Sequence, residues 1–193
     1  AKVESATFSV QVTSANFVAL TEDSASLMLL DTATNKFVRV TSTTPQPYLV
    51  TQVGVRQIIY RLGNGGADWI YDAYTGRNVK LAAGIEGGAR YLAKTSDGNV
   101  IYRTGTAPSQ TLWSYNPTTG VARSIADGGL STMTVLVNAN DLVFYEDGVN
   151  GQSDIFFYDP SEDEVVAVSE NANDEQLLAV LPDGGAVFSR VGS

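Results

Sequence analysis

Four Asx residues recur along this chain at nearly equal spacing, each at the end of an apolar run. They are Asp31, Asp72, Asn116 and Asp159, and successive members are 41, 44 and 43 residues apart. Carboxylates in such a row could act as general bases. Asx side chains also accept hydrogen bonds from the amides of a turn just ahead of them. We favour this turn-capping interpretation, because a group repeated in every copy of a repeat describes architecture.

A second recurring set consists mainly of charged residues near the ends of other apolar runs. Its members are Thr21, Arg61, Arg103, Glu146 and Arg190. Guanidinium groups at one rim could bind a carboxylate, a sulfate or an acidic partner surface through paired hydrogen bonds, so Arg61, Arg103, Glu146 and Arg190 are candidate binding residues. Only Arg61 and Arg103 are expected in strict register, with the others one position later. The alternative is that strand ends are charged for solubility.

One acidic loop offers oxygen ligands for a cation. Asp147, Asn150 and Asp154 could hold Ca²⁺, although the loop lacks the EF-hand spacing. The glycine-rich stretch 62–66 leads into an apolar strand rather than a helix, so it does not predict a phosphate cradle. We expect no catalytic residue and no cofactor, with Ca²⁺ at this loop as the alternative.

Composition narrows the classes of function. The chain has no Cys and no His among 193 residues, which removes thiolate nucleophiles, imidazole bases and zinc sites built on those residues. A net charge of −9 without a basic cluster argues against nucleic acid as a partner. No apolar run reaches membrane-spanning length, so no membrane insertion is expected. Few Lys and many Thr, Ser, Asn and Gly residues favour an extracytoplasmic protein.

The elements that position these residues follow the same period. A pair of strands is predicted before each Asx run, and a fifth pair follows the last run. The second strand of each pair begins 41, 42, 42 and 44 residues after the previous one, at Phe17, Ile58, Val100, Leu142 and Ala186. A further short strand follows each Asx residue. A period in the low forties filled by four short strands, named a to d here, predicts an all-β propeller with a four-stranded sheet in each blade.

The expected domain is a single propeller over 1–193, and the strand count does not close its ring. The predicted ranges are 6–43, 47–83, 89–127 and 131–170 for four blades and 176–193 for a half blade. We therefore expect about four and a half blades, with the ring completed by a second copy of this chain, by another chain or by further blades of a longer polypeptide. The Trp and Tyr residues of the c strands are expected to pack between blades.

The turns carry a family resemblance. Two-residue hairpin turns are expected at Asp97-Gly98 and Asp183-Gly184. These turns, together with the c–d segments 31–36 and 115–120, resemble the WD40-like, TolB-type propeller repeats and the propeller domains of prolyl-oligopeptidase-like peptidases. The resemblance implies an interaction platform or a gating domain beside a hydrolase. The chain has no G-x-S-x-G nucleophile elbow, so peptidase activity would have to lie outside it.

The function that these observations favour is a non-catalytic binding or scaffold module that presents rim loops to a protein or peptide partner. One alternative is a propeller associated with an enzyme, either the gate of a hydrolase or a carboxylate-based lyase or lactonase. A second alternative is a structural repeat of a cell-envelope or surface assembly.

Overall fold

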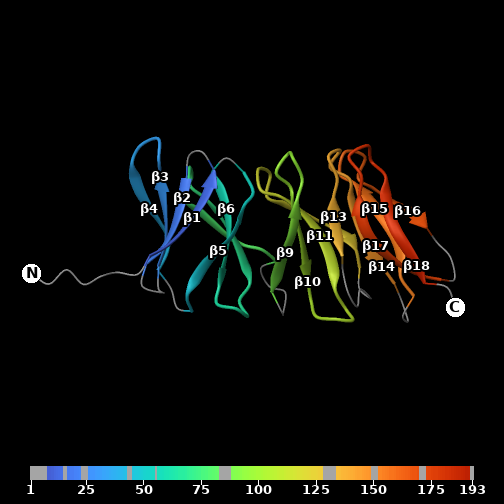
Figure 1. Cartoon of the computed structure of the whole chain (residues 1–193). Helices are drawn as coiled ribbons and strands as arrows, with labels where there is room; N and C mark the ends of the chain where they lie inside the picture. The colour runs from blue at the N-terminus through green and yellow to red at the C-terminus, as the bar shows by residue number, and fades with distance from the viewer. Residues whose placement is uncertain are drawn as a thin grey trace, which may run out of the picture. The chain divides into compact units, whose positions relative to one another are not determined.

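The structure is a computed structural model that describes residues 8–14, 17–22, 26–42, 45–54, 56–82, 88–127, 134–148, 152–169 and 173–191. Within these ranges the chain forms eighteen β-strands, all paired antiparallel, and no helix that could cross a membrane (Figure 1). It divides into two compact units, Ala1–Gly84 and Ile85–Ser193. The two units are described separately below.

The first unit contains two four-stranded sheets in which consecutive strands are neighbours. The first sheet consists of β1 (Phe8–Ser14), β2 (Phe17–Glu22), β3 (Ser26–Asp31) and β4 (Lys36–Thr41). The second consists of β5 (Pro47–Gln52), β6 (Gln57–Leu62), β7 (Asp68–Asp72) and β8 (Arg77–Lys80). Short polar connections allow each strand to return beside the one before it.

The second unit contains two four-stranded sheets of the same order and one two-stranded sheet. The third sheet consists of β9 (Ala89–Lys94), β10 (Val100–Thr104), β11 (Thr111–Asn116) and β12 (Val121–Ala126). The fourth consists of β13 (Val135–Val137), β14 (Val143–Asp147), β15 (Asp154–Asp159) and β16 (Glu164–Ser169). The fifth consists of β17 (Asp174–Val180) and β18 (Ala186–Val191).

Each four-stranded sheet has two faces, because side chains alternate along a strand. We call one face the front face: there the third-strand residues one and three positions before the Asx residue pair with residues of the second strand. On the other, back face, the third-strand residue two positions before the Asx residue makes such a pair. The front-face pairs are Val18–Leu30 and Leu20–Met28, Ile58–Tyr71 and Tyr60–Trp69, Val100–Tyr115 and Tyr102–Trp113, and Val143–Tyr158 and Tyr145–Phe156. The back-face pairs are Ala19–Leu29, Ile59–Ile70, Ile101–Ser114 and Phe144–Phe157.

Within each unit, the back face of one sheet packs on the front face of the next. In the first unit, Ala19 and Leu29 of the first sheet share a buried cluster with Ile58, Tyr60 and Tyr71 of the second. The second unit repeats this order between its third and fourth sheets, where Ile101 and Leu112 meet Val143, Tyr145 and Tyr158. It repeats it again between the fourth and fifth, where Phe144 and Ile155 meet Leu177 and Phe188. The fold therefore uses one kind of junction three times.

The a–b turns differ from the two-residue hairpins expected from the sequence. Thr95 N donates to Asn99 O at 3.0 Å, and Gly98 N donates to Thr95 O at 3.1 Å. Three residues therefore lie between the closing pair, and the third has a positive φ of 90° at Gly98. This is a type I turn followed by a left-handed residue, the usual three-residue hairpin loop.

The other two a–b turns of the second unit have the same hydrogen bonds, at 138–142 and 181–185. The left-handed position is filled by Gly184 in one and by Asp141, with a φ of 65°, in the other. Residues 138–141 lack the Asp-Gly pair of the other two turns, but the turn itself is retained. Asp tolerates this conformation better than most non-glycine residues, which is why the substitution does not break the turn.

Candidate functional site

The Asx row caps the c–d turns, as expected from the sequence. In the second sheet, Asp72 Oδ1 accepts hydrogen bonds from Tyr74 N at 2.9 Å and Thr75 N at 3.0 Å. Asn116 Oδ1 accepts from Thr118 N and Thr119 N at 2.9 and 3.0 Å. Asp31 Oδ1 accepts in the same way from the amides of Ala33 and Thr34, whereas Asp159 Oδ1 accepts from the amide and the hydroxyl of Ser161.

These hydrogen bonds set the charge state of the three carboxylates. The pKa of Asp31 lies below its ordinary value, chiefly because of its hydrogen bond with the Thr34 side chain, and that of Asp159 is lowered chiefly by the Ser161 hydroxyl. Burial opposes ionisation of Asp72, but hydrogen bonds from Thr75, Gln57 and Tyr74 outweigh it and lower its pKa. A general base needs a pKa near the working pH, so these shifts run against catalysis by this row.

The residue four positions after each Asx residue adopts a left-handed backbone. These residues are Asn35, Gly76, Gly120 and Asp163, with φ of 53°, 68°, 76° and 57°. Asn and Gly, which favour this conformation, fill the first three positions, whereas the fourth is an aspartate. The side chain of Asp163 accepts a hydrogen bond from Tyr158 Oη at 2.9 Å and forms an ion pair with Arg123. These contacts are consistent with an aspartate being retained at a position that glycine usually takes.

Some aromatic residues of the c strands pack between sheets: Tyr71 lies in the cluster shared by the first and second sheets with Trp69 packed against it, and Tyr158 lies in the cluster of the third and fourth. Tyr60 stacks on Trp69 with ring centroids 6.3 Å apart, and Tyr102 stacks on Trp113 at the same distance. Both pairs lie on front faces, and Tyr60 belongs to the core cluster of the first unit. Burial raises the pKa of Tyr60 and that of Tyr102 to about 12. Tyr60 and Tyr102 are therefore part of the packed interior.

Arg61, the first candidate binding residue, is clamped by a buried carboxylate. Its Nε lies 2.5 Å from Asp68 Oδ1 and its Nη2 lies 2.8 Å from Asp68 Oδ2, which makes a two-pronged ion pair. The Asp68 side chain has 0% of its surface exposed, and that of Arg61 has 18%. Arg61 Nη1 also donates to Tyr48 Oη at 3.2 Å. The hydrogen bonds to Asp68 hold the pKa of Arg61 above its ordinary value.

Arg103 takes the same place in the third sheet, with a neutral partner. Its Nη1 donates to Oε1 of the buried Gln110 at 2.9 Å. In both sheets the arginine is the last residue but one of strand b, and its partner lies seven residues later, at or just before the start of strand c. Each pair therefore ties together the two ends of a b–c loop. The sequence contains this equal spacing, which is the one signal that could have identified Asp68 and Gln110.

Glu146 is also buried, and it joins two sheets of the second unit. Its Oε1 accepts a hydrogen bond from Leu177 N at 2.7 Å, which links β14 to β17. Counted from the Asx residues, Thr21, Arg61, Arg103 and Glu146 pair at the same position of their sheets. The expected one-residue offset of Thr21 and Glu146 is therefore wrong, because apolar runs begin at different depths in different strands and are a poor origin for counting.

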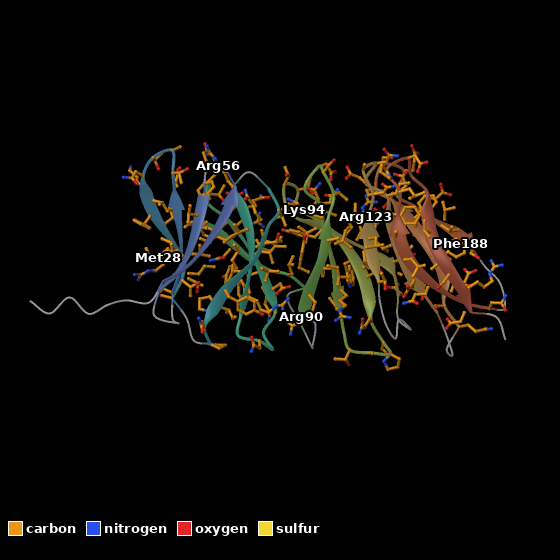
Figure 2. The ribbon with its side chains drawn as sticks, in the orientation of Figure 1. Met28, Arg56, Arg90, Lys94, Arg123 and Phe188 are labelled. Carbon is orange, nitrogen blue, oxygen red and sulfur yellow. The ribbon has the colours of Figure 1, made fainter. Side chains whose placement is uncertain are left out.

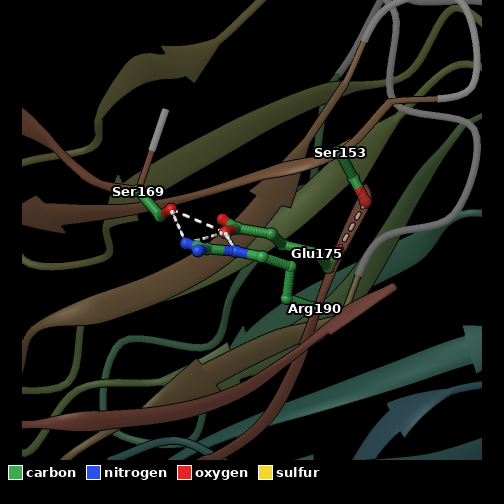
Figure 3. A network of polar contacts seen from close by, with 4 residues as sticks. All are labelled: Ser153, Ser169, Glu175 and Arg190. Atoms are coloured by element: carbon green, nitrogen blue, oxygen red, sulfur yellow. Dashed lines mark hydrogen bonds and ion pairs between the residues drawn. The ribbon is translucent and has the colours of Figure 1, made fainter. Parts of the chain in front are cut away.

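Arg190 belongs to a network that ties the last hairpin to the fourth sheet (Figure 3). Its Nε and Nη2 donate to Glu175 Oε1 at 3.0 and 2.9 Å, and Ser169 Oγ donates to the same oxygen at 2.6 Å. Glu175 N donates to Ser153 O at 2.8 Å, and Ser153 Oγ donates to Glu175 O at 2.5 Å. Each candidate binding residue thus has an internal partner, and whether any of them also contacts a ligand stays a prediction.

The candidate cation residues are only partly placed. Asp147 and Asp154 pair directly across β14 and β15, and Asn150 lies outside the described residues. Burial raises the pKa of Asp147, and the nearby charge of Asp154 adds to this. No group of three or more His, Cys, Asp or Glu residues in the described part of the chain could hold a metal ion. Calcium binding by this loop remains an untested prediction.

No protein-family model matches the sequence, and no curated protein matches it. Solved structures do match. Dipeptidyl peptidase 4 of Porphyromonas gingivalis is 11% identical with a TM-score of 0.64, over 91% of this chain and 34% of that protein. The tricorn protease is 14% identical with a TM-score of 0.57, over 95% and 19%. A prolyl endopeptidase is 13% identical with a TM-score of 0.54, over 90% and 31%.

The fold is a β-propeller. The matched proteins carry propeller domains, so the expected resemblance to TolB-type and prolyl-oligopeptidase-like propellers is confirmed at the level of fold. Identities of 11–14% show the fold alone. The chain spans between 19% and 34% of the length of these three proteins.

Proposed function

We propose that this chain is a non-catalytic binding or scaffold module whose propeller rim loops hold a protein or peptide partner. The observation that carries the proposal is the construction of the b–c loops, which have fixed bases and exposed tips. The ion pair of Arg61 with Asp68 fixes one base, and the hydrogen bond of Arg103 to Gln110 fixes another. A loop held in one conformation loses little entropy when it binds a partner.

The tips themselves are neutral. In the third sheet, residues 106–109 are exposed and read Thr-Ala-Pro-Ser. Ser109 N donates to Thr106 O at 2.9 Å, and a Cβ at Gly105 would lie 2.4 Å from Ser109 O, so the loop closes tightly on its own backbone. Exposed hydroxyls and backbone groups without charge suit hydrogen bonding to a polypeptide, since charged residues are depleted at the centres of protein interfaces.

In this proposal, the carboxylates that could act as catalytic bases have a structural role. The Asx row is occupied in turn capping, and the sequence has no His or Cys to serve as base or nucleophile. A second candidate function is a propeller that gates a hydrolase. This second function is favoured by the structural match to peptidases, because this chain corresponds to only a part of each of them. We further propose an extracytoplasmic location, on the basis of composition.

The test compares two doubly substituted chains of equal charge. Thr106→Lys with Ser109→Lys alters the loop tip, whereas Thr118→Lys with Ala122→Lys alters exposed positions at the opposite end of the same sheet. Proteins cross-linked to each chain in an extract of the source cells are identified by mass spectrometry. A partner kept by the wild type and the second variant but lost from the first supports the proposal. Equal capture by all three contradicts it.

Catalysis is tested on the same preparation. The isolated chain should show no turnover on panels of peptides, esters and glycosides. A rate that a single Asp or Glu substitution abolishes would overturn the non-catalytic assignment. If the captured partner is a peptidase or another hydrolase, the gating function gains support over a general scaffold.

A further inference from the structure

The three a–b turns of the second unit, 95–99, 138–142 and 181–185, share the same closing hydrogen bonds. Figure 2 labels Arg90 and Lys94 near opposite ends of the third sheet, and the first of these turns directly follows Lys94. Because the strands are antiparallel, the a–b turns lie at the opposite end of each sheet from the b–c loops. This end therefore takes no part in the function proposed above.

The first two of these turns are joined by a carboxylate. Asp141, the left-handed residue of the 138–142 turn, accepts hydrogen bonds from Ser96 N at 2.6 Å and from Ser96 Oγ at 2.5 Å. Both carboxylate oxygens are used, and Ser96 is the second residue of the 95–99 turn. The left-handed residue of one turn thus faces the turn of the preceding sheet.

The next pair of turns has the same arrangement without the carboxylate. Its left-handed residue is Gly184, which has no side chain to extend toward the preceding turn. A Cβ on Gly184 would lie 3.3 Å from Asn140 Nδ2 and 3.8 Å from Asn138 Nδ2. Apart from Gly184 and its chain neighbours, no other heavy atom of the described residues lies within 4 Å of that position. Two amide donors therefore flank the place where a side chain equivalent to that of Asp141 would begin.

Asn138 is the buried one of these two donors, with 7% of its surface exposed. Its Oδ1 accepts hydrogen bonds from Asn140 N at 2.9 Å and from Leu142 N at 3.0 Å, which fixes the orientation of the amide. Its Nδ2 is buried and has no hydrogen-bond partner in the described part of the chain. A buried donor without an acceptor is costly, so an acceptor that enters the gap is stabilised there.

We propose that the gap between the 138–142 and 181–185 turns binds a carboxylate of another molecule. One carboxylate oxygen accepts a hydrogen bond from Asn138 Nδ2, and the other accepts one from Asn140 Nδ2. A carboxylate only accepts hydrogen bonds, whereas a carboxamide brings a single oxygen and an NH2 group that opposes one of the two donors. The carboxylate belongs to an acidic side chain, to the C-terminus of a polypeptide or to a small organic acid.

The acidic residues of the two turns are held away from the gap. Asp141 binds Ser96, and Asp183 Oδ1 accepts a hydrogen bond from Gly185 N at 3.2 Å within its own turn. Ala139 N corresponds to Ser96 N, so the gap has a backbone amide at the position that binds Asp141 in the first junction. Because all these donors are uncharged and the chain carries a net charge of −9, the affinity for acetate alone should be weak.

Acetate tests the site in the complete chain. Nuclear magnetic resonance spectra that correlate amide protons with nitrogen follow the side-chain NH2 groups of Asn138 and Asn140. Acetate should shift both signals saturably, whereas acetamide and chloride at equal concentration should not. A peptide with blocked ends and one Asp, compared with a peptide that has no acidic residue but a free C-terminus, then shows which kind of carboxylate binds more tightly. No shift with acetate, or an equal shift with acetamide, would overturn the proposal.

Two substitutions remove the site in different ways. Asn138→Asp keeps an oxygen to cap the turn but replaces the NH2 donor by a second oxygen. Gly184→Asp fills the gap with the chain's own carboxylate, in the left-handed region that Asp141 adopts in the preceding turn. Thr118→Asp is the control, because it adds the same charge at an exposed position of a c–d turn.

Thermal unfolding first shows which variants fold as the wild type does. The Asn140 signal should then lose its response to acetate in Asn138→Asp and in Gly184→Asp, and keep it in Thr118→Asp. If one of the two site variants does not fold, the other decides the test, and the titration of the wild type depends on neither. A folded site variant that still responds as the wild type does, or a control that loses the response, would contradict carboxylate binding in this gap.

Discussion

Replacing Asp68 by alanine should destabilise the first unit more than replacing Gln110 by alanine destabilises the second. Both side chains anchor the base of a b–c loop through an arginine seven residues earlier. Asp68 is fully buried and charged, whereas Gln110 is buried and neutral. Comparison of the two therefore separates the effect of an unpaired buried charge from the effect of a loosened loop.

The magnitudes follow from what each change leaves behind. Removing one partner of a buried ion pair costs about 3–5 kcal/mol. Because the Arg61 side chain keeps 18% of its surface in water and its hydrogen bond to Tyr48, we expect a cost of about 3 kcal/mol, at the lower end of that range. Gln110→Ala loses one hydrogen bond from a charged donor, worth about 1.5–3 kcal/mol, and the solvent-accessible part of Arg103 reduces this to about 1.5 kcal/mol.

Urea unfolding can be followed in each unit separately. Trp69 lies in the first unit and Trp113 in the second, so Trp113→Phe and Trp69→Phe backgrounds report the two units one at a time. The paired replacement of Arg61 by Met and Asp68 by Leu should recover much of the loss, because two apolar side chains remove both charges from the interior. If Asp68→Ala costs no more than Gln110→Ala, the ion pair is not the anchor that we infer.

Further changes probe the turn caps and the cation loop. Asp72→Ala and Asp159→Ala should each lower the free energy of unfolding by about 1 kcal/mol, while the Asn substitutions should lower it less, since Asn116 already caps its turn with an amide oxygen. Both carboxylates have lowered pKa values in the folded chain, so their stabilising effect is present above the unfolded pKa of about 3.9 and is lost as pH falls through the folded pKa. Thermal unfolding between pH 5 and 2.5 should accordingly show a weaker pH dependence in the double Asn variant than in the wild type, and an equal dependence would refute the assignment. The raised pKa of Asp147 has the opposite sign: Asp147→Asn should raise the melting temperature at pH 7 and have no effect once pH lies below the unfolded pKa.

The architecture was predictable because it depends on the local chemistry of the turns. A turn that needs an acceptor at one position and a left-handed residue four positions later constrains residue types wherever it occurs, so the Asx row reveals the blade period. The same reasoning fails at Asp163 and Asp141, where an aspartate takes the left-handed position without changing the turn. Residue type indicates a conformation there but does not dictate it.

The partners of the charged residues were not predictable in the same way. Glu146 bonds to Leu177, 31 residues away, and Glu175 bonds to Ser169 and Arg190 across two sheets. Such contacts depend on how sheets stack, and the stacking is set by apolar faces that carry no information about single polar pairs. For this reason, the sequence locates the arginines, and apart from the equal seven-residue spacing to Asp68 and Gln110 it gives no indication that buried groups bind them.

The repeated junction has a consequence for how a gene of this kind can change length. Every junction described above is made from the same two faces in the same order. Duplicating one whole repeat of about 42 residues inserts a sheet that offers a front face to its predecessor and a back face to its successor, so no apolar surface is left bare. A duplication or deletion that begins inside a repeat leaves a strand without its ladder. Evolution can therefore lengthen or shorten such a chain only in whole repeats, and a boundary between two sheets is the natural place to join or divide it.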